Sequence, residues 1–182
     1  MRYLATILYE DHPRETKEFG PHNLVLACVA DRTHQTIWQI KRLFDGRPMG
    51  GDSKVVKESS RVDIIAPDCH PVVMLLDDDK IRRHLGLASG AASDDVAAAI
   101  RANCSEPDKL HIFLLTRNVD DLVQVAARST DWKGEIKKKP VVRDRILNKA
   151  AYNVNAAQRA LIQEEVPGLA DLVEFLVSLI AQ

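Results

Sequence analysis

The fold is decided by the stretch VVMLLDD, residues 72–78. Five consecutive apolar residues follow Pro71 and end at acidic residues, which is typical of a strand buried on both faces. The stretches YLATILY (residues 3–9) and LHIFLLT (residues 110–116) have the same character. Buried strands that alternate with helical segments indicate a parallel sheet covered by helices on both sides. We therefore expect a three-layer α/β domain with a mainly parallel central sheet and a C-terminal helical extension.

The segments between these strands are less uniform in pattern. Residues 22–31 (HNLVLACVAD) suit either a buried strand or a buried helix, whereas residues 33–44 (THQTIWQIKRLF) predict a helix with one apolar face. Residues 45–54 (DGRPMGGDSK) contain three glycines and a proline, which predicts a surface connection. Only about five residues separate VDII (62–65) from the next strand, which is too short for a parallel crossover. Either that pair is antiparallel, or residues 53–65 are helical.

Helical patterns recur along the rest of the chain. They cover residues 80–87, 94–103, 119–128, 156–166 and 168–180. The last of these has one apolar stripe, formed by Leu169, Leu172, Val173, Leu176, Leu179 and Ile180. Such a stripe predicts core packing or a dimer seam. We divide the chain into an α/β domain at residues 1–130 and, packed on it, a basic segment with C-terminal helices at 131–182.

Composition limits the classes of function. The 182 residues are 46% apolar and 28% charged with a formal net charge of −1, so binding to nucleic acid or to a membrane has to come from a local patch. Cys28, Cys69 and Cys104 form no CxxC pair, which argues against a zinc site or a disulfide framework. The first residues lack the apolar core of a signal peptide, and no stretch of about 18 apolar residues is present to span a membrane. We expect a cytoplasmic protein.

Carboxylates follow two of the predicted strands directly. Glu10 and Asp11 follow the first strand, and Asp77, Asp78 and Asp79 end the second. In an extended backbone Asp77 and Asp79 point the same way, and Glu10 comes within their reach if the two strands are neighbours. Carboxylates crowded in this way are stable when a hard cation such as Mg²⁺ neutralises them. The alternative is that these acids are solvated strand ends and helix caps.

The motifs ILYE (ending at Glu10) and LLDDD (containing Asp77 and Asp79) resemble the Toprim domain. That fold is found in topoisomerases, bacterial primases, recombination proteins and overcoming-lysogenization-defect nucleases. The resemblance covers roughly residues 3–128 and implies a Rossmann-like domain in which Glu10 is a metal ligand or general acid/base and Asp77 and Asp79 bind Mg²⁺ or Mn²⁺. It further implies that Asp120 or Asp121 supplies another carboxylate. Toprim proteins usually place glycine after the glutamate, and Asp11 stands there in this chain, where it either alters the turn or adds a further ligand.

A second, weaker resemblance is to the receiver domain of response regulators. In that reading the acids of ILYED end the first strand, Asp77 is the phosphorylated residue, Thr116 supplies the switch hydroxyl and Lys138 binds the phosphate. The separation of about 66 residues between the first acids and Asp77 is larger than a receiver needs, so we rank this resemblance below the first.

Residues 133–149 carry seven basic residues and two acidic ones. Lys137, Lys138, Lys139 and Arg143 are the candidate contacts to phosphate groups, and a solvated basic surface is the alternative. The function expected from these features is Mg²⁺-dependent, nuclease-like phosphodiester chemistry on nucleic acid, in a setting such as bacterial defence or a mobile locus. The alternative is a non-catalytic interaction or regulatory module with a receiver-like or degenerate Toprim-like fold. Such a module would bind a protein partner or a second copy through the C-terminal helix.

Overall fold

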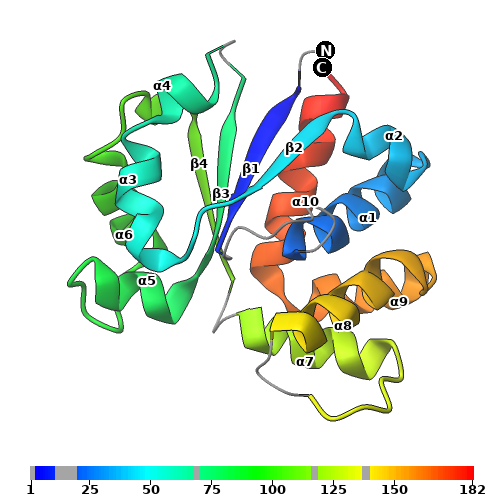
Figure 1. The fold of residues 1–182 in the computed structure, drawn as a ribbon. Helices are drawn as coiled ribbons and strands as arrows, with labels where there is room; N and C mark the ends of the chain where they lie inside the picture. Colours follow the sequence, from blue (N-terminus) through cyan, green and yellow to red (C-terminus); the bar gives the residue numbers. More distant parts are fainter. Residues whose placement is uncertain (1–2, 11–19, 68–69, 116–118, 137–139) are drawn as a thin grey trace.

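The computed structural model describes residues 3–10, 20–67, 70–115, 119–136 and 140–182. In this part of the chain the centre is a sheet of four parallel strands in the order β2-β1-β3-β4 (Figure 1). The strands are β1 (Ala5–Tyr9), β2 (Phe44–Pro48), β3 (Val72–Asp77) and β4 (Leu110–Leu115). The predicted α/β class with a mainly parallel sheet is therefore confirmed.

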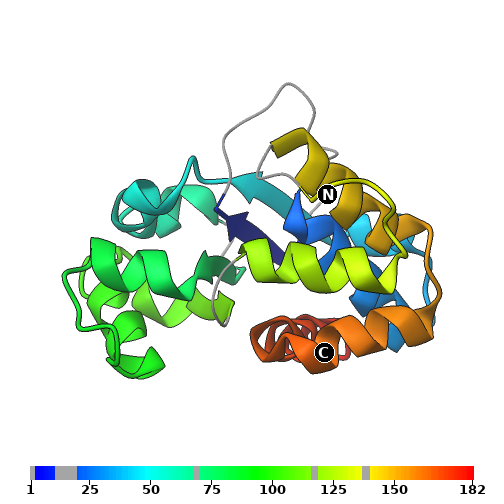
Figure 2. The ribbon, with the colours of Figure 1, turned by 90° about the horizontal axis from the view of Figure 1, so that it is seen from below.

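Helices cover both faces of the sheet (Figures 1 and 2). One face is covered by α1 (Pro21–Thr33), α2 (Ile37–Lys41), α7 (Val119–Ser129), α8 (Pro140–Tyr152), α9 (Ala156–Glu165) and α10 (Pro167–Ile180). The other face is covered by α3 (Val55–Ser59), α4 (Val62–Ile65), α5 (Asp78–His84) and α6 (Ser93–Arg101), with short 3₁₀ turns at η1 (Asp52–Lys54) and η2 (Pro107–Lys109). No helix in the described ranges is long and apolar enough to cross a membrane.

The two central strands, β1 and β3, are buried on both sides, as their largely apolar sequences predict. Ile7 and Val73 project into the core beneath α1 and α10. Leu8, Val72 and Met74 project into the core beneath α3 to α6. This alternation is the two-residue period of a pleated strand, and here both faces of the pleat meet apolar side chains.

Residues 22–31, whose sequence suits either a strand or a helix, lie in helix α1. Every residue from Pro21 to Ala30 is buried, because α1 lies between the sheet and helices α8 and α10. A helix that is enclosed on all sides needs no polar face, so its sequence lacks the helical alternation that identifies surface helices.

The prediction that residues 45–54 form only a surface connection is wrong for their first part. Asp45 to Pro48 belong to β2, the edge strand, which pairs in parallel with β1. An edge strand hydrogen-bonds on one side alone, so it tolerates Gly46 and Pro48 at positions that a central strand would not. Pairing with β1, rather than the strand propensity of its own side chains, makes this segment a strand.

The question about residues 53–65 is settled in favour of helix. VDII is helix α4, which follows α3, and the pair forms the crossover from β2 to β3. The stripe on the C-terminal helix is core packing, since Leu169, Leu172, Val173 and Leu176 are fully buried against the rest of the chain. Helix α10 contacts α1, α9 and β4.

The order of the strands creates a topological switch point between β1 and β3. The chain leaves β1 through α1 on one face of the sheet, and it leaves β3 through α5 on the other face (Figure 1). The connections that follow these neighbouring strands therefore run to opposite faces of the sheet, which makes the carboxyl ends of β1 and β3 a topological switch point. In open α/β sheets ligands bind at such a topological switch point.

Candidate functional site

Two carboxylates lie at the switch point. Asp77 is the last residue of β3 and Glu10 directly follows β1, and these two strands pair with Tyr9 opposite Leu75. Only 1% of Asp77 and 8% of Glu10 is exposed to solvent. Buried carboxylates are costly unless they are hydrogen-bonded or lie beside a positive charge. The sequence left open whether the two strands are neighbours, and the structure shows that they are.

The positive charge at this place is Lys80, in the first turn of α5. Its Nζ lies 2.6 Å from Oδ2 of Asp77. Burial by itself lowers the pKa of Lys80, but the hydrogen bond and charge attraction to Asp77, and the attraction to Glu10 and Asp120, raise that pKa above its usual value. Three carboxylates from three elements thus act on one ammonium group. We call Glu10, Asp77, Lys80 and Asp120 the switch-point cluster.

Among the described residues, the switch-point cluster combines three carboxylates with the ammonium group of Lys80. Lys80 is 46% exposed, so solvent reaches the cluster at this residue. Within the described residues no group of three or more His, Cys, Asp or Glu side chains is already arranged to hold a metal ion. The donors are nevertheless carboxylate oxygens, which hard divalent cations prefer, and Mg²⁺ needs only one or two of them beside water and substrate oxygens.

Asp79 lies apart from the cluster, although the sequence suggested that it points the same way as Asp77. That suggestion assumes an extended backbone, but helix α5 begins at Asp78, so the alternation of a strand stops at Asp77. Asp78 pairs with Arg82, with 2.7 Å between Oδ1 and Nη2. Asp79 is exposed and borders a separate cavity beside α5.

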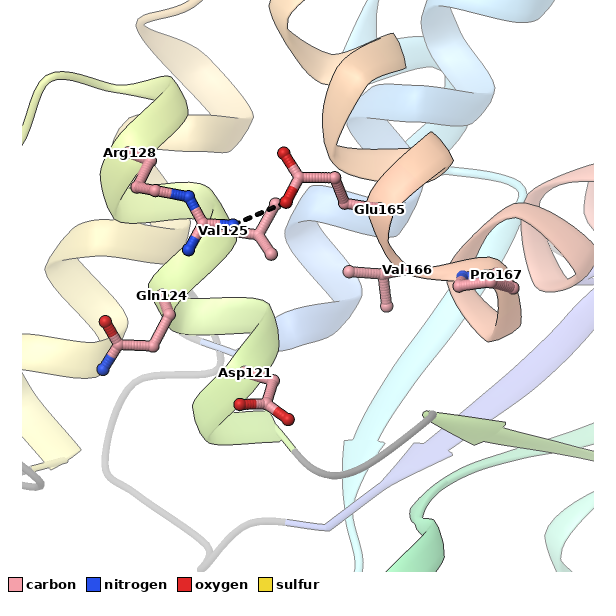
Figure 3. A pocket seen from close by; sticks show the side chains of 7 residues that line it. All are labelled: Asp121, Gln124, Val125, Arg128, Glu165, Val166 and Pro167. Atoms are coloured by element: carbon pink, nitrogen blue, oxygen red, sulfur yellow. Dashed lines mark hydrogen bonds and ion pairs between the residues drawn. The ribbon is translucent and has the colours of Figure 1, made fainter.

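Asp120 and Asp121 also separate, because consecutive residues of helix α7 point about 100° apart. Asp120 is half-buried and acts on Lys80. Asp121 borders a cavity of about 310 Å³ between α7 and the junction of α9 and α10 (Figure 3). The rim of that cavity carries the ion pair between Arg128 and Glu165, 2.5 Å apart, and Val125 is part of its wall.

Several predicted site residues lie outside the described part of the chain. These are Asp11, Thr116, Lys137, Lys138 and Lys139. Arg143 is described: it is half-buried in the first turn of α8, a helix that packs on α1 and α7.

A buried histidine lies next to the switch point, at the start of α1. The ring of His22 stacks on Tyr9 with 4.7 Å between centroids, and Gly46 of β2 has no side chain where the ring lies. Burial, together with a smaller effect of the charge of Lys41, lowers the pKa of His22 to about 4 against the opposing effect of Asp45. His22 is therefore neutral at physiological pH.

Sequence reasoning assigned no role to Lys80 or to His22. The available signal for Lys80 was its position one helical turn after Asp77, a spacing at which opposite charges meet. His22 carried no such signal, because its partners come from β1 and β2 through tertiary packing.

Comparison with known proteins finds similarity to solved structures only. One is the C-terminal region of the Xanthomonas campestris pv. campestris OLD protein phased with iodine, at 12% identity over 95% of this chain and 97% of that chain, with a TM-score of 0.43. Another is the C-terminal region of the Burkholderia pseudomallei OLD protein, at 9% identity over 98% of this chain and 88% of that chain, with a TM-score of 0.42. No protein-family model and no curated protein matches the chain. These likenesses do not assign the chain to a family, and no residue role is transferred from them.

Proposed function

We propose that the chain carries out divalent-cation-dependent phosphodiester chemistry on nucleic acid at the switch-point cluster. One observation carries the proposal: Asp77 lies 2.6 Å from Lys80, and Glu10 and Asp120 also attract that ammonium group, at the place where open α/β sheets bind their ligands. Carboxylates gathered at one place attract counter-ions, and a divalent cation is the counter-ion that matches carboxylate ligands.

In this proposal Glu10 and Asp77 hold Mg²⁺ or Mn²⁺, and the negative charge of Asp120 also attracts the cation. The fit rests on Lys80, since an ammonium group already lies against Asp77 where a metal cation would bind. A bound divalent cation would supply Lewis-acid stabilisation of the charge that develops on phosphate oxygens. Asp79, which borders the cavity beside α5, is a ligand in this scheme only if it reaches the cation from that side.

Lys80 has two roles in this scheme. Without metal its ammonium group compensates the buried charge of Asp77. When a metal replaces it, its flexible and partly exposed side chain is free to donate hydrogen bonds to a phosphate oxygen. Glu10, at the end of β1, is the residue for proton transfer because it is buried beside the proposed metal position.

Nucleic acid is the proposed substrate because the basic segment 133–149 offers a local patch on a chain of nearly zero net charge. Lys133 is 81% exposed and Arg145 is exposed, whereas Arg143 is half-buried. Lys137, Lys138, Lys139 and Arg143 remain the proposed phosphate contacts of this segment.

The test combines metal titration with a cleavage assay. Mg²⁺ and Mn²⁺ are titrated by calorimetry into the wild type, Asp77→Asn, Asp79→Asn and the exposed control Asp94→Asn, and DNA and RNA oligonucleotides are incubated with each protein with metal or with EDTA. We expect saturable binding and cleavage that Asp77→Asn removes and Asp94→Asn preserves. Metal-dependent cleavage that survives in Asp77→Asn would refute the role of the cluster. Asp79→Asn decides whether that residue belongs to the ligand set.

A regulatory module is the second candidate, and one observation favours it. The strand order β2-β1-β3-β4 is that of the first four strands in the 2-1-3-4-5 sheets to which receivers belong, with Asp77 at the end of the third strand. Within the described residues, however, β4 is followed by helices α7 to α10. The apolar stripe of α10 is used inside the chain's own core, so it offers no free surface to a partner. Absence of metal binding, with phosphorylation of Asp77 by a small phosphodonor, would favour this candidate.

A further inference from the structure

A second cavity lies beside α5, the helix that also carries Lys80 of the switch-point cluster. Its volume is about 550 Å³, and its lining includes Asp79, Arg82, Arg83 and Ser89. Helix α5 begins at the residue after Asp77, so a single short helix contributes Lys80 to the cluster and both arginines to the cavity. Gly86, also in the lining, has a positive φ of 69° and no atom within 4 Å of the place where a Cβ would lie. The cavity is therefore open at this glycine.

Arg82 is the unusual residue of this cavity. It is only 8% exposed, and its Nε and Nη2 donate to Oδ1 of Asp78 at 2.8 Å and 2.7 Å. Its Nη1 is buried and meets no hydrogen-bond acceptor in the described part of the chain. Buried donors are nearly always satisfied, and a guanidinium nitrogen that lacks an acceptor loses the hydrogen bonds it would make to water. This donor lacks an acceptor that a ligand can supply.

We propose that this cavity binds a phosphate group of the nucleic-acid substrate next to the phosphodiester at the switch-point cluster. Arg82 supplies the donor at Nη1, the exposed Arg83 supplies a second guanidinium, and the hydroxyl of Ser89 completes the donor set. Arginine suits this role because its planar fork matches the geometry of phosphate oxygens. The inference rests on the proposed function for the identity of the ligand.

The charged side chains that line the cavity indicate how strongly a phosphate group should bind there. Asp78 is compensated by Arg82, and Asp79 and Arg83 carry opposite charges, so the charged side chains that line the cavity balance one another. Attraction of phosphate therefore depends on directed hydrogen bonds more than on net charge. We expect a modest contribution to affinity, and a dependence on the shape of the arginine side chain as well as on its charge.

The experiment measures binding without catalysis. Fluorescent DNA and RNA oligonucleotides are titrated in EDTA at several salt concentrations, by anisotropy, with the wild type, Arg83→Gln, Arg82→Lys and the control Lys57→Gln. Lys57 is exposed on the neighbouring helix α3 and loses the same charge as Arg83 does. Arg82→Lys keeps a positive charge beside Asp78, and its unfolding midpoint is recorded to establish that the variant folds. Inorganic phosphate is titrated separately by calorimetry.

We expect Arg83→Gln to weaken oligonucleotide binding by about 3- to 10-fold and to reduce the slope of log K against log salt by about 1, as loss of one phosphate contact does. Arg82→Lys should weaken binding to a similar degree, and Lys57→Gln should not change it. Unchanged oligonucleotide affinity in both arginine variants would overturn the proposal. The proposal would equally be overturned if the arginine variants lost binding of inorganic phosphate but kept their affinity for oligonucleotides, because the cavity would then bind a free anion and not the substrate.

The failure of this inference is distinguishable from failure of the proposed function. If the wild type cleaves no nucleic acid but binding in EDTA depends on Arg83, the phosphate site stands and the chemistry does not. If cleavage depends on Asp77 while the KM is the same in Arg83→Gln and the wild type, the chemistry stands and the phosphate site does not.

Discussion

The buried histidine at the start of α1 predicts a specific dependence of stability on pH. His22 is 5% exposed, stacks on Tyr9 and has its pKa lowered from 6.5 to about 4, chiefly by burial. Between these two values the unfolded chain binds a proton at His22 that the folded chain does not. The free energy of unfolding therefore falls as the pH falls from 6.5 towards 4, and above 6.5 the neutral ring has no such effect.

The magnitude follows from the difference between the two pKa values. At about 1.4 kcal/mol for each pKa unit, the change from 6.5 to about 4 is worth about 3 kcal/mol in full. Between about pH 7 and pH 5 the loss from this group alone is about 2 kcal/mol, because the unfolded histidine is then almost fully protonated. A single domain is typically stable by about 5–15 kcal/mol, so the effect is measurable.

The assay is urea unfolding at several pH values between about 7 and 4.5 for the wild type, His22→Gln and the control His84→Gln. His84 is an exposed histidine of α5, so its replacement controls for the loss of a histidine as such. We expect His22→Gln to be less stable than the wild type at pH 7 and to lose about 2 kcal/mol less on acidification. Parallel pH profiles for the wild type and His22→Gln would refute the reasoning, as would an NMR titration of the folded protein with a His22 pKa near 6.5.

Three further perturbations test the packing and the site. Gly168→Ala places a methyl carbon 2.0 Å from a backbone oxygen of β4, so it should destabilise the fold by about 1–3 kcal/mol in chemical unfolding, whereas Gly90→Ala, which meets no atom within 4 Å, should be nearly neutral. Arg159→Met removes two hydrogen bonds of 2.6 Å and 2.8 Å to Asp31 of α1 and two more to backbone carbonyls. It should lower the free energy of unfolding by roughly 2–4 kcal/mol. A decrease below about 1 kcal/mol would contradict the view that this contact joins α9 to α1. Lys80→Met removes the cation beside Asp77, so calorimetry should find tighter Mg²⁺ binding, by roughly tenfold or more at low salt; weaker binding would mean that Lys80 helps to build the metal site.

The central strands could be predicted because their burial requires a run of consecutive apolar residues, which is visible in the sequence. Residues 3–9 and 72–78 were expected as strands, and β1 and β3 occupy Ala5–Tyr9 and Val72–Asp77. A strand covered on both faces has to be apolar at consecutive positions, whatever its neighbours are. The apolar stripe of the last helix could also be predicted, because the helical spacing of its apolar residues lies within one continuous segment of the sequence.

The edge strand and the membership of the site were not predictable in this way. β2 owes its conformation to hydrogen bonds with β1 rather than to its own side chains. The expectation that Asp77 and Asp79 point together failed geometrically, because the strand ends and α5 begins between them. A shift of one residue in the position at which a strand ends changes the direction of the side chains that follow it.

The sequence by itself determined that the chain forms a parallel α/β sheet and that carboxylates follow its strands, because burial and period are local properties that residue order records. Only the tertiary structure decided that Glu10, Asp77 and Asp120 meet around Lys80 while Asp79 and Asp121 border separate cavities. That outcome depends on strand order and on the rotation of two helices, which come from contacts between residues far apart in the chain.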